Sequence, residues 1–241
     1  MKSLAAGGVA IAVALGPPLH GVAEELFAAH MVQHLMLVAV AAPLLAAGLP
    51  GAALLVRLPP TARRSIGRWL RRAQRLVPLA RPHIAWLVGV WLLHVVILWA
   101  WHAPALYEAA LRRPALHALE HASLLLSATA FWAMVLRPRD HRGVGAFGAL
   151  LYLFAGAGQS TALGALLTLV AEPSYPRHAP TAARWGLTPL EDQHLAGLIM
   201  WVLGGVGYLV AALVVLARVL RHERGLPNAQ TAQAMHGGRE P

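Results

Sequence analysis

The sequence contains no cysteine in its 241 residues. Without thiols the chain can form neither a disulfide framework nor a CxxC redox motif, and any metal site must use His, Met, Asp or Glu side chains. Charged residues are also scarce, at 12% of the chain, whereas 58% of the residues are hydrophobic. Soluble globular domains rarely combine these two properties, so the composition predicts an integral membrane protein.

Long apolar segments predict an all-α fold, a polytopic transmembrane helix bundle with about six spans, because a helix needs roughly 20 residues to cross a bilayer. The predicted spans are residues 3–19, 26–48, 83–102, 115–136, 144–170 and 191–217. The first also resembles a signal peptide, but no clear A-x-A site follows it, so we expect a retained helix. Residues 1–222 would form one transmembrane domain, and the polar residues 223–241 a disordered cytoplasmic tail.

The positions of the basic residues predict the orientation of the chain. Its net charge is +10, but the Lys and Arg residues lie between the predicted spans rather than in one patch, so we expect no nucleic-acid partner. Six spans put 16 of the 20 basic residues on the side of both termini, and Arg112, Arg113, Arg177 and Arg184 on the other. The positive-inside rule therefore predicts cytoplasmic N- and C-termini.

Two predicted spans carry matching pairs of histidines. His30-x-x-Gln33-His34 lies at the outer start of the second span, and His117-x-x-Glu120-His121 at the outer start of the fourth. Positions i, i+3 and i+4 share one face of a helix, so each span presents two imidazoles together. Facing helices in a bundle can gather such side chains around one metal ion. We predict a metal site near the outer face with His30, His34, His117 and His121 as ligands.

Further polar residues lie at the same predicted depth. His102, at the outer end of the third span, is a fifth candidate ligand. Glu120 and Asp192 are predicted to orient the ligating histidines by accepting their second N–H. Met200 offers a thioether that favours Cu(I), and Gln33 and Gln193 are auxiliary candidates.

Other histidines have simpler interpretations. His20, His178 and His194 each stand alone near a membrane interface, and we expect them to be solvated. His94 lies two helical turns deeper and would either join the site or bond to a neighbouring helix. No serine stands beside a base, and the HExxH motif is missing, so the sequence predicts a binding and transfer protein rather than an enzyme.

Several ordered blocks of sequence resemble the CtaG family of caa-type cytochrome c oxidase assembly factors. The blocks are residues 30–36, 42–45, 48–50, 101–107, 117–121, 131–132, 190–193 and 196–201. The resemblance implies a multi-pass protein of the bacterial plasma membrane that matures a haem-copper oxidase, by supplying copper to the catalytic subunit. It also implies roles for the residues that match the motifs: His30, Gln33, His34, His102, His117, Glu120, His121, Asp192, Gln193 and Met200.

Three alternatives to copper supply remain open. Paired histidines on adjacent helices could instead hold b-type haem in a redox protein. A permease would need polar groups along a path to the inner side, and a metal-free scaffold would use the histidines for hydrogen bonds. A periplasmic copper donor is a further expected partner, and the Gly-rich helix faces would permit a homodimer.

Overall fold

The structure is a computed structural model, which describes residues 2–48, 82–136 and 145–223 and a few positions between 59 and 68. These residues form helices and their connections. Five helices are long and apolar enough to cross a membrane, or six if one bent pair counts as a span. The prediction of an all-α, polytopic transmembrane bundle is therefore confirmed. The predicted tail beyond Glu223 lies outside the described residues.

The predicted spans agree closely with the helices of the structure. The helices are α1 (Lys2–Leu15), α2 (Pro17–Glu25), α3 (Phe27–Leu35), the π-helical segment η1 (Met36–Ala41), α4 (Ala42–Gly48), α7 (Pro82–His102), α8 (Pro104–Arg112), α9 (Pro114–Leu136), α10 (Gly145–Leu169), η3 (Pro176–His178), α11 (Ala179–Ala182), η4 (Ala183–Trp185) and α12 (Pro189–Glu223).

The first predicted span, residues 3–19, is wrong in one respect, because the chain bends by 42° between α1 and α2. Gly16 is extended there, and Pro17 and Pro18 follow it. Proline has no N–H to continue the hydrogen-bond ladder, and its ring clashes with the preceding turn, so α1 ends at Leu15. The Gly-Pro-Pro sequence is the signal for this break.

The second span is built from three consecutive segments, α3, η1 and α4, which together cover Phe27–Gly48. Leu26 is extended and separates α2 from α3, so α3 begins a new helix rather than continuing α2. The six-residue π-helical segment η1 follows α3 directly. Such segments are rare and occur often at functional sites.

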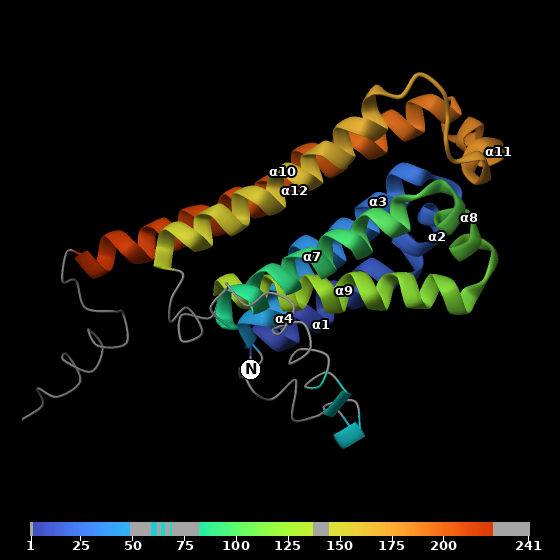
Figure 1. The fold of residues 1–241 in the computed structure, drawn as a ribbon. Coiled ribbons are helices and arrows are strands. Elements are labelled where there is room, and N and C mark those ends of the chain that lie inside the picture. Colours follow the sequence, from blue (N-terminus) through green and yellow to red (C-terminus); the bar gives the residue numbers. More distant parts are fainter. Residues whose placement is uncertain are drawn as a thin grey trace, which may run out of the picture.

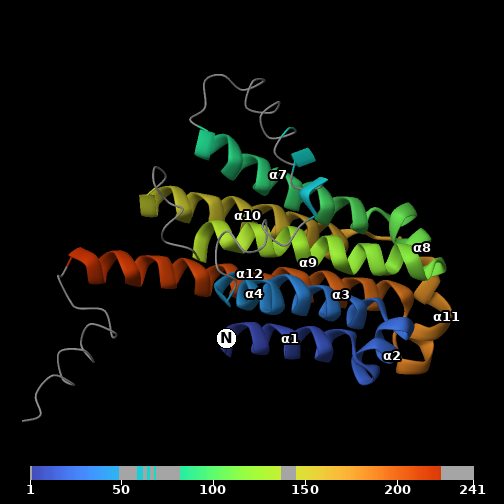
Figure 2. The same cartoon turned by 90° about the horizontal axis from the view of Figure 1, so that it is seen from below.

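The helices place several sequence-distant segments at one end of the bundle. Figures 1 and 2 show α10 and α12 running side by side, with α3 next to α12 and α9 between α7 and α4. The short helices α2, α8 and α11 gather at one end, and the start of α1 and the end of α12 lie at the other (Figure 1). The first turns of α3, α9 and α12 and the last turn of α7 therefore meet at the end that carries α2, α8 and α11.

Two apolar clusters hold the bundle together. One packs Phe131, Trp132 and Tyr208 between α9 and α12, toward the end of the bundle where the chain starts. The other packs Phe27, Tyr107, Leu124 and their neighbours around the first turns of α3. Large apolar side chains also point outward along α10 and α12, as expected for helices that contact lipid.

Candidate metal centre

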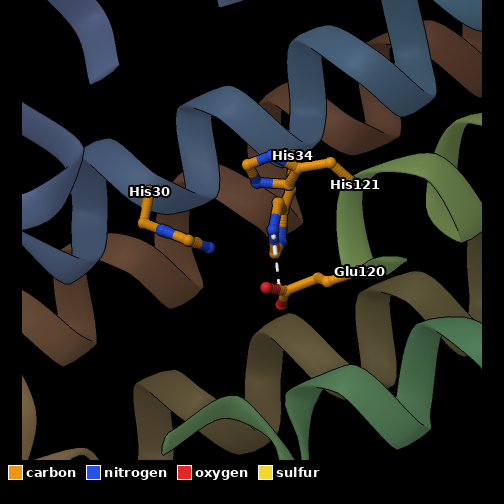
Figure 3. Close-up of side chains that lie close together, drawn as sticks. All are labelled: His30, His34, Glu120 and His121. Carbon is orange, nitrogen blue, oxygen red and sulfur yellow. Dashed lines mark ion pairs between the residues drawn. The ribbon is translucent and has the colours of Figure 1, made fainter. Parts of the chain in front are cut away.

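Helices α3 and α9 bring four potential ligands together inside the bundle. His30 and His34 come from α3, and Glu120 and His121 from α9 (Figure 3). One ligand atom from each residue lies within 4.8 Å of the corresponding atom of every other residue, and all four side chains are buried. The two matching histidine motifs of the sequence therefore face each other across the interface between α3 and α9. We call these four residues the buried cluster.

The distances within the buried cluster are short. His34 Nε2 lies 3.5 Å from Glu120 Oε1. The ring centroids of His30 and His34 are 4.4 Å apart, and those of His34 and His121 5.3 Å apart. Donors around a tetrahedral ion with bonds of about 2.0 Å are separated by roughly 3.4 Å, so modest side-chain rotations would complete such a site.

Most of the polar side-chain atoms of the buried cluster have no hydrogen-bond partner. This holds for Nε2 of His30 and His121, both ring nitrogens of His34 and both carboxylate oxygens of Glu120. Burying a polar group without a partner costs about 1–3 kcal/mol, and folded proteins rarely leave several together. Coordination of a cation would satisfy these atoms, and a negative Glu120 would offset part of its charge.

His102 lies beside the buried cluster, with a defined protonation pattern. Its Nδ1 is 2.7 Å from the carbonyl oxygen of Leu98, which can only accept a hydrogen bond, so Nδ1 carries the proton. Nε2 is then left with a free lone pair, is buried and has no partner. The ring centroid lies 5.8 Å from that of His34. These features fit a ligand that joins the cluster from α7.

His117 lies beside His30 and His121, whereas His102 lies beside His34, and His117 is nearer the surface. Its ring centroid is 4.4 Å from that of His121 and 5.4 Å from that of His30. It is only half-buried, in contrast to the other paired histidines. Its Nε2 also lacks a partner. His117 therefore extends the buried cluster outward.

Asp192 is fully buried but bonds to backbone amides. Its two carboxylate oxygens accept hydrogen bonds from the N–H groups of Phe27 and Ala28, at 2.8 and 2.9 Å. These amides are the unpaired donors of the first turn of α3, which a carboxylate satisfies well. Asp192 therefore does not make the predicted bond to a ligating histidine. Instead it comes from α12 and holds in place the start of α3, the helix that carries His30 and His34.

The remaining predicted residues hold the surrounding helices or line a cavity. Gln33 Nε2 donates to the carbonyl of Ala14, at 2.8 Å, and ties α3 to α1. Gln193 Oε1 accepts from the backbone N–H of Ser174, at 2.7 Å. Met200 lines a small cavity of about 30 Å³ together with His34 and His102.

His178 was predicted to be solvated, and this prediction is wrong. Its side chain is buried, and Nε2 lies 2.8 Å from the hydroxyl of Tyr107. Burial lowers the pKa of His178 and raises that of Tyr107, so both groups are neutral at pH 7. The His178 ring lies 6.5 Å from that of His30. Nothing local in the sequence signals this contact, which joins α8 to η3.

His94 bonds to a neighbouring helix, which was one of its two predicted roles. Its Nδ1 lies 3.2 Å from Ser127 Oγ, and that hydroxyl donates to the carbonyl of Leu124. The serine hydroxyl therefore accepts from His94, and the bond links α7 to α9.

The fold and the buried cluster define a polytopic membrane protein with a candidate metal site of three histidines and a glutamate. Residues 3–222 match the family described as cytochrome c oxidase caa3 assembly factor (Caa3_CtaG), and the chain belongs to this family. The resemblance inferred from the motif blocks is thereby confirmed. Neither a curated protein nor a solved structure matches the chain. The protein is a multi-pass membrane assembly factor for caa3-type oxidase.

Proposed function

We propose that the protein binds copper in the buried cluster and supplies it to the copper centre of the oxidase catalytic subunit during assembly. His30, His34 and His121 would be ligands together with Glu120, and His102 and His117 would complete or exchange with them. The single observation that carries this proposal is the group of unpartnered donor atoms between α3 and α9. The chain would then act by binding and transfer, not as an enzyme.

The choice of copper rests on the donors and on the client. Imidazole binds copper, zinc, iron and nickel, and the thioether of Met200, in the cavity beside His34 and His102, favours Cu(I). A haem-copper oxidase needs both iron and copper, but its iron is inserted as haem, so copper is the metal of this group that an assembly factor would supply as an ion. Ligand exchange with the client would need a coordination position that opens readily.

The charge distribution supports an extracytoplasmic orientation of the site. The end of the bundle with α2, α8 and α11 also contains the buried cluster. It carries Arg112, Arg113, Arg177 and Arg184, whereas the other 16 basic residues belong to the predicted opposite side. We therefore place the buried cluster toward the extracytoplasmic face of the bacterial plasma membrane, where a periplasmic donor could deliver the ion.

A haem-binding redox protein fits the site less well. The cavity that reaches His34 and His102 has a volume of about 30 Å³. That volume accommodates roughly one or two water molecules, far less than a porphyrin. The imidazoles of the buried cluster lie against one another rather than on two sides of a slot wide enough for a macrocycle.

A permease also fits less well. Beyond His94, the described core toward the other end of the bundle is built around Phe131, Trp132 and Tyr208. These residues pack against one another, with ring centroids 5.4–5.9 Å apart. A permease would need ionisable or polar groups along this part of the path.

Maturation of the oxidase in cells tests the proposal. The chain is expressed as wild type, His34→Ala or His194→Ala in a host that lacks its own assembly factor, and the copper-to-haem ratio of the purified oxidase is measured. His194 is a suitable control because it bonds to the carbonyl of Val170, away from the cluster. Wild type and His194→Ala should restore copper, whereas His34→Ala should yield oxidase with haem and depleted copper. Full restoration by His34→Ala would favour the metal-free scaffold and overturn the proposal.

A further inference from the structure

We propose that His20, Glu24 and His117 form a second, outer metal-binding position, at which an ion from solution is captured before it passes to the buried cluster. We call these three residues the outer position. The inference rests on the proposed function, because it assigns the route by which the cluster is filled.

The outer position begins with two groups that reach water. His20 and Glu24 lie one turn apart on α2, and His20 Nε2 is 3.8 Å from Glu24 Oε1. Their side chains are 40% and 69% exposed. An imidazole and a carboxylate at this spacing offer two ligand atoms to a divalent or monovalent transition-metal cation. The bend after Leu15 directs α2 away from the axis of α1.

Glu24 differs in this respect from its neighbour Glu25. Glu25 Oε2 accepts a hydrogen bond from Trp185 Nε1, at 2.8 Å, and Oε1 lies 3.7 Å from Arg184. Its charge is therefore engaged in holding η4 against α2. Glu24 has only the His20 contact among the ion pairs of the described residues, so its carboxylate remains available to a cation.

The outer position is connected to the buried cluster by a series of neighbouring imidazoles. The ring of His20 lies parallel to that of His117, with centroids 6.1 Å apart and an interplanar angle of 20°. His117 lies 4.4 Å from His121, and His121 lies 5.3 Å from His34. Exposure falls along this series, from the half-buried His20 and His117 to the buried His121 and His34.

Such a series of ligands would let a cation enter the buried cluster without losing all of its coordination. A bare cation in a low-dielectric interior is strongly unfavourable, so an ion must stay coordinated while it moves inward. Neighbouring imidazoles permit this, because each new ligand can bind before the previous one leaves. Glu24 adds negative charge at the water-exposed end, which raises the local concentration of cations.

The approach from the neighbouring short helices is closed. Tyr107 and His178 bond to each other and, with Phe27 and Tyr175, form a packed aromatic group over His30. Each of these four side chains is buried. The side of the cluster with His117 and His20 is therefore the one on which imidazoles extend to the surface.

Loading kinetics test the inference. Purified wild type, Glu24→Gln, His20→Ala and the control His194→Ala are mixed with copper sulfate, quenched with EDTA at successive times, desalted and analysed for bound copper. Glu24→Gln should load at least about tenfold more slowly, because electrostatic capture raises association rates by this order or more. His20→Ala should also load more slowly, because it removes a ligand of the outer position. Both should reach the wild-type copper content at long times, and His194→Ala should match wild type throughout.

The outcomes separate the inference from the proposed function. Wild-type loading rates in both variants would overturn the outer position, as would a lowered final copper content with an unchanged rate. Glu24→Gln keeps the test valid if His20→Ala folds poorly, because the Glu24 side chain is largely exposed. A wild-type protein that takes up no copper would instead overturn the proposed function.

Discussion

His34 Nε2 and Glu120 Oε1 lie 3.5 Å apart, on different helices, and both side chains are buried. Neither group has a hydrogen-bond partner, so the pair stabilises the fold little by itself and leaves its donor atoms free to bind a cation. The contact joins α3 to α9 and sets the position of the site in the bundle.

Glu120→Gln should separate metal binding from folding. The substitution retains the shape of the side chain and removes the carboxylate that would bind the ion, so copper affinity should fall at least about tenfold, the loss seen even when a group that only supports a metal ligand is removed. The metal-free variant should unfold at the same temperature as wild type or a higher one, because Glu120 makes no hydrogen bond that the substitution would remove. Competition titration with a chelator measures the first effect, and thermal unfolding in detergent the second. Unchanged copper affinity would remove Glu120 from the site.

Asp192→Ala should destabilise the protein through α3. It leaves the buried amides of Phe27 and Ala28 without acceptors, which should lower the free energy of unfolding by about 2 kcal/mol or more. Glu191→Gln is the matched control, because Glu191 bonds to Thr188 at the exposed start of α12. Thermal unfolding of the two variants compares them directly. Equal destabilisation would show that the bonds from Asp192 to α3 contribute no more to stability than the exposed bonds of Glu191.

The sequence predicts the spans and the paired histidines well, for a physical reason. Spans follow from apolar length, and the i, i+4 pairs place His30 with His34 and His117 with His121 whatever the packing. The shared depth of the two motifs follows from the charge distribution. Contact between α3 and α9 depends on side-chain packing, which periodicity does not encode, and the structure supplies it.

Contacts between distant segments are what the sequence does not predict. Asp192 bonds to residues 164 and 165 positions away, so its role in holding α3 has no local signal. The same applies to His178, which meets Tyr107 across 71 positions. The break after Leu15 is different, because the Gly-Pro-Pro sequence does indicate it.

His178 should make stability depend on pH. Burial lowers the pKa of His178 in the folded state, so below about pH 6.5 the unfolded chain binds a proton that the folded chain does not. The contribution of His178 to the free energy of unfolding is fully present above that pH. It falls by up to about 1.4 kcal/mol over the first pH unit below it. His178→Gln should therefore show a smaller decrease in unfolding temperature on acidification than wild type. Parallel decreases for the two proteins would contradict this origin.

Gly197→Ala should disturb the packing of α10 against α12. A Cβ at Gly197 would meet the side chain of Thr168 and lie 2.7 Å from the carbonyl oxygen of Gly164. Backbone atoms cannot move aside cheaply, so we expect destabilisation by about 1–3 kcal/mol. Gly205→Ala on the same helix is the control, because a Cβ there meets nothing within 4 Å. Equal unfolding temperatures for the two variants would show that this close approach is not needed.

The copper content of the purified protein tests the central claim most directly. Wild type, His30→Ala/His34→Ala and His94→Ala are loaded with copper, freed of excess metal and analysed by mass spectrometry. His94 is a buried histidine outside the cluster, bonded to Ser127, so it controls for the loss of any buried imidazole. Wild type and His94→Ala should retain at least about one copper ion per chain, and the double variant almost none. Equal copper content in wild type and the folded double variant, whether high or absent, would contradict a copper site between α3 and α9.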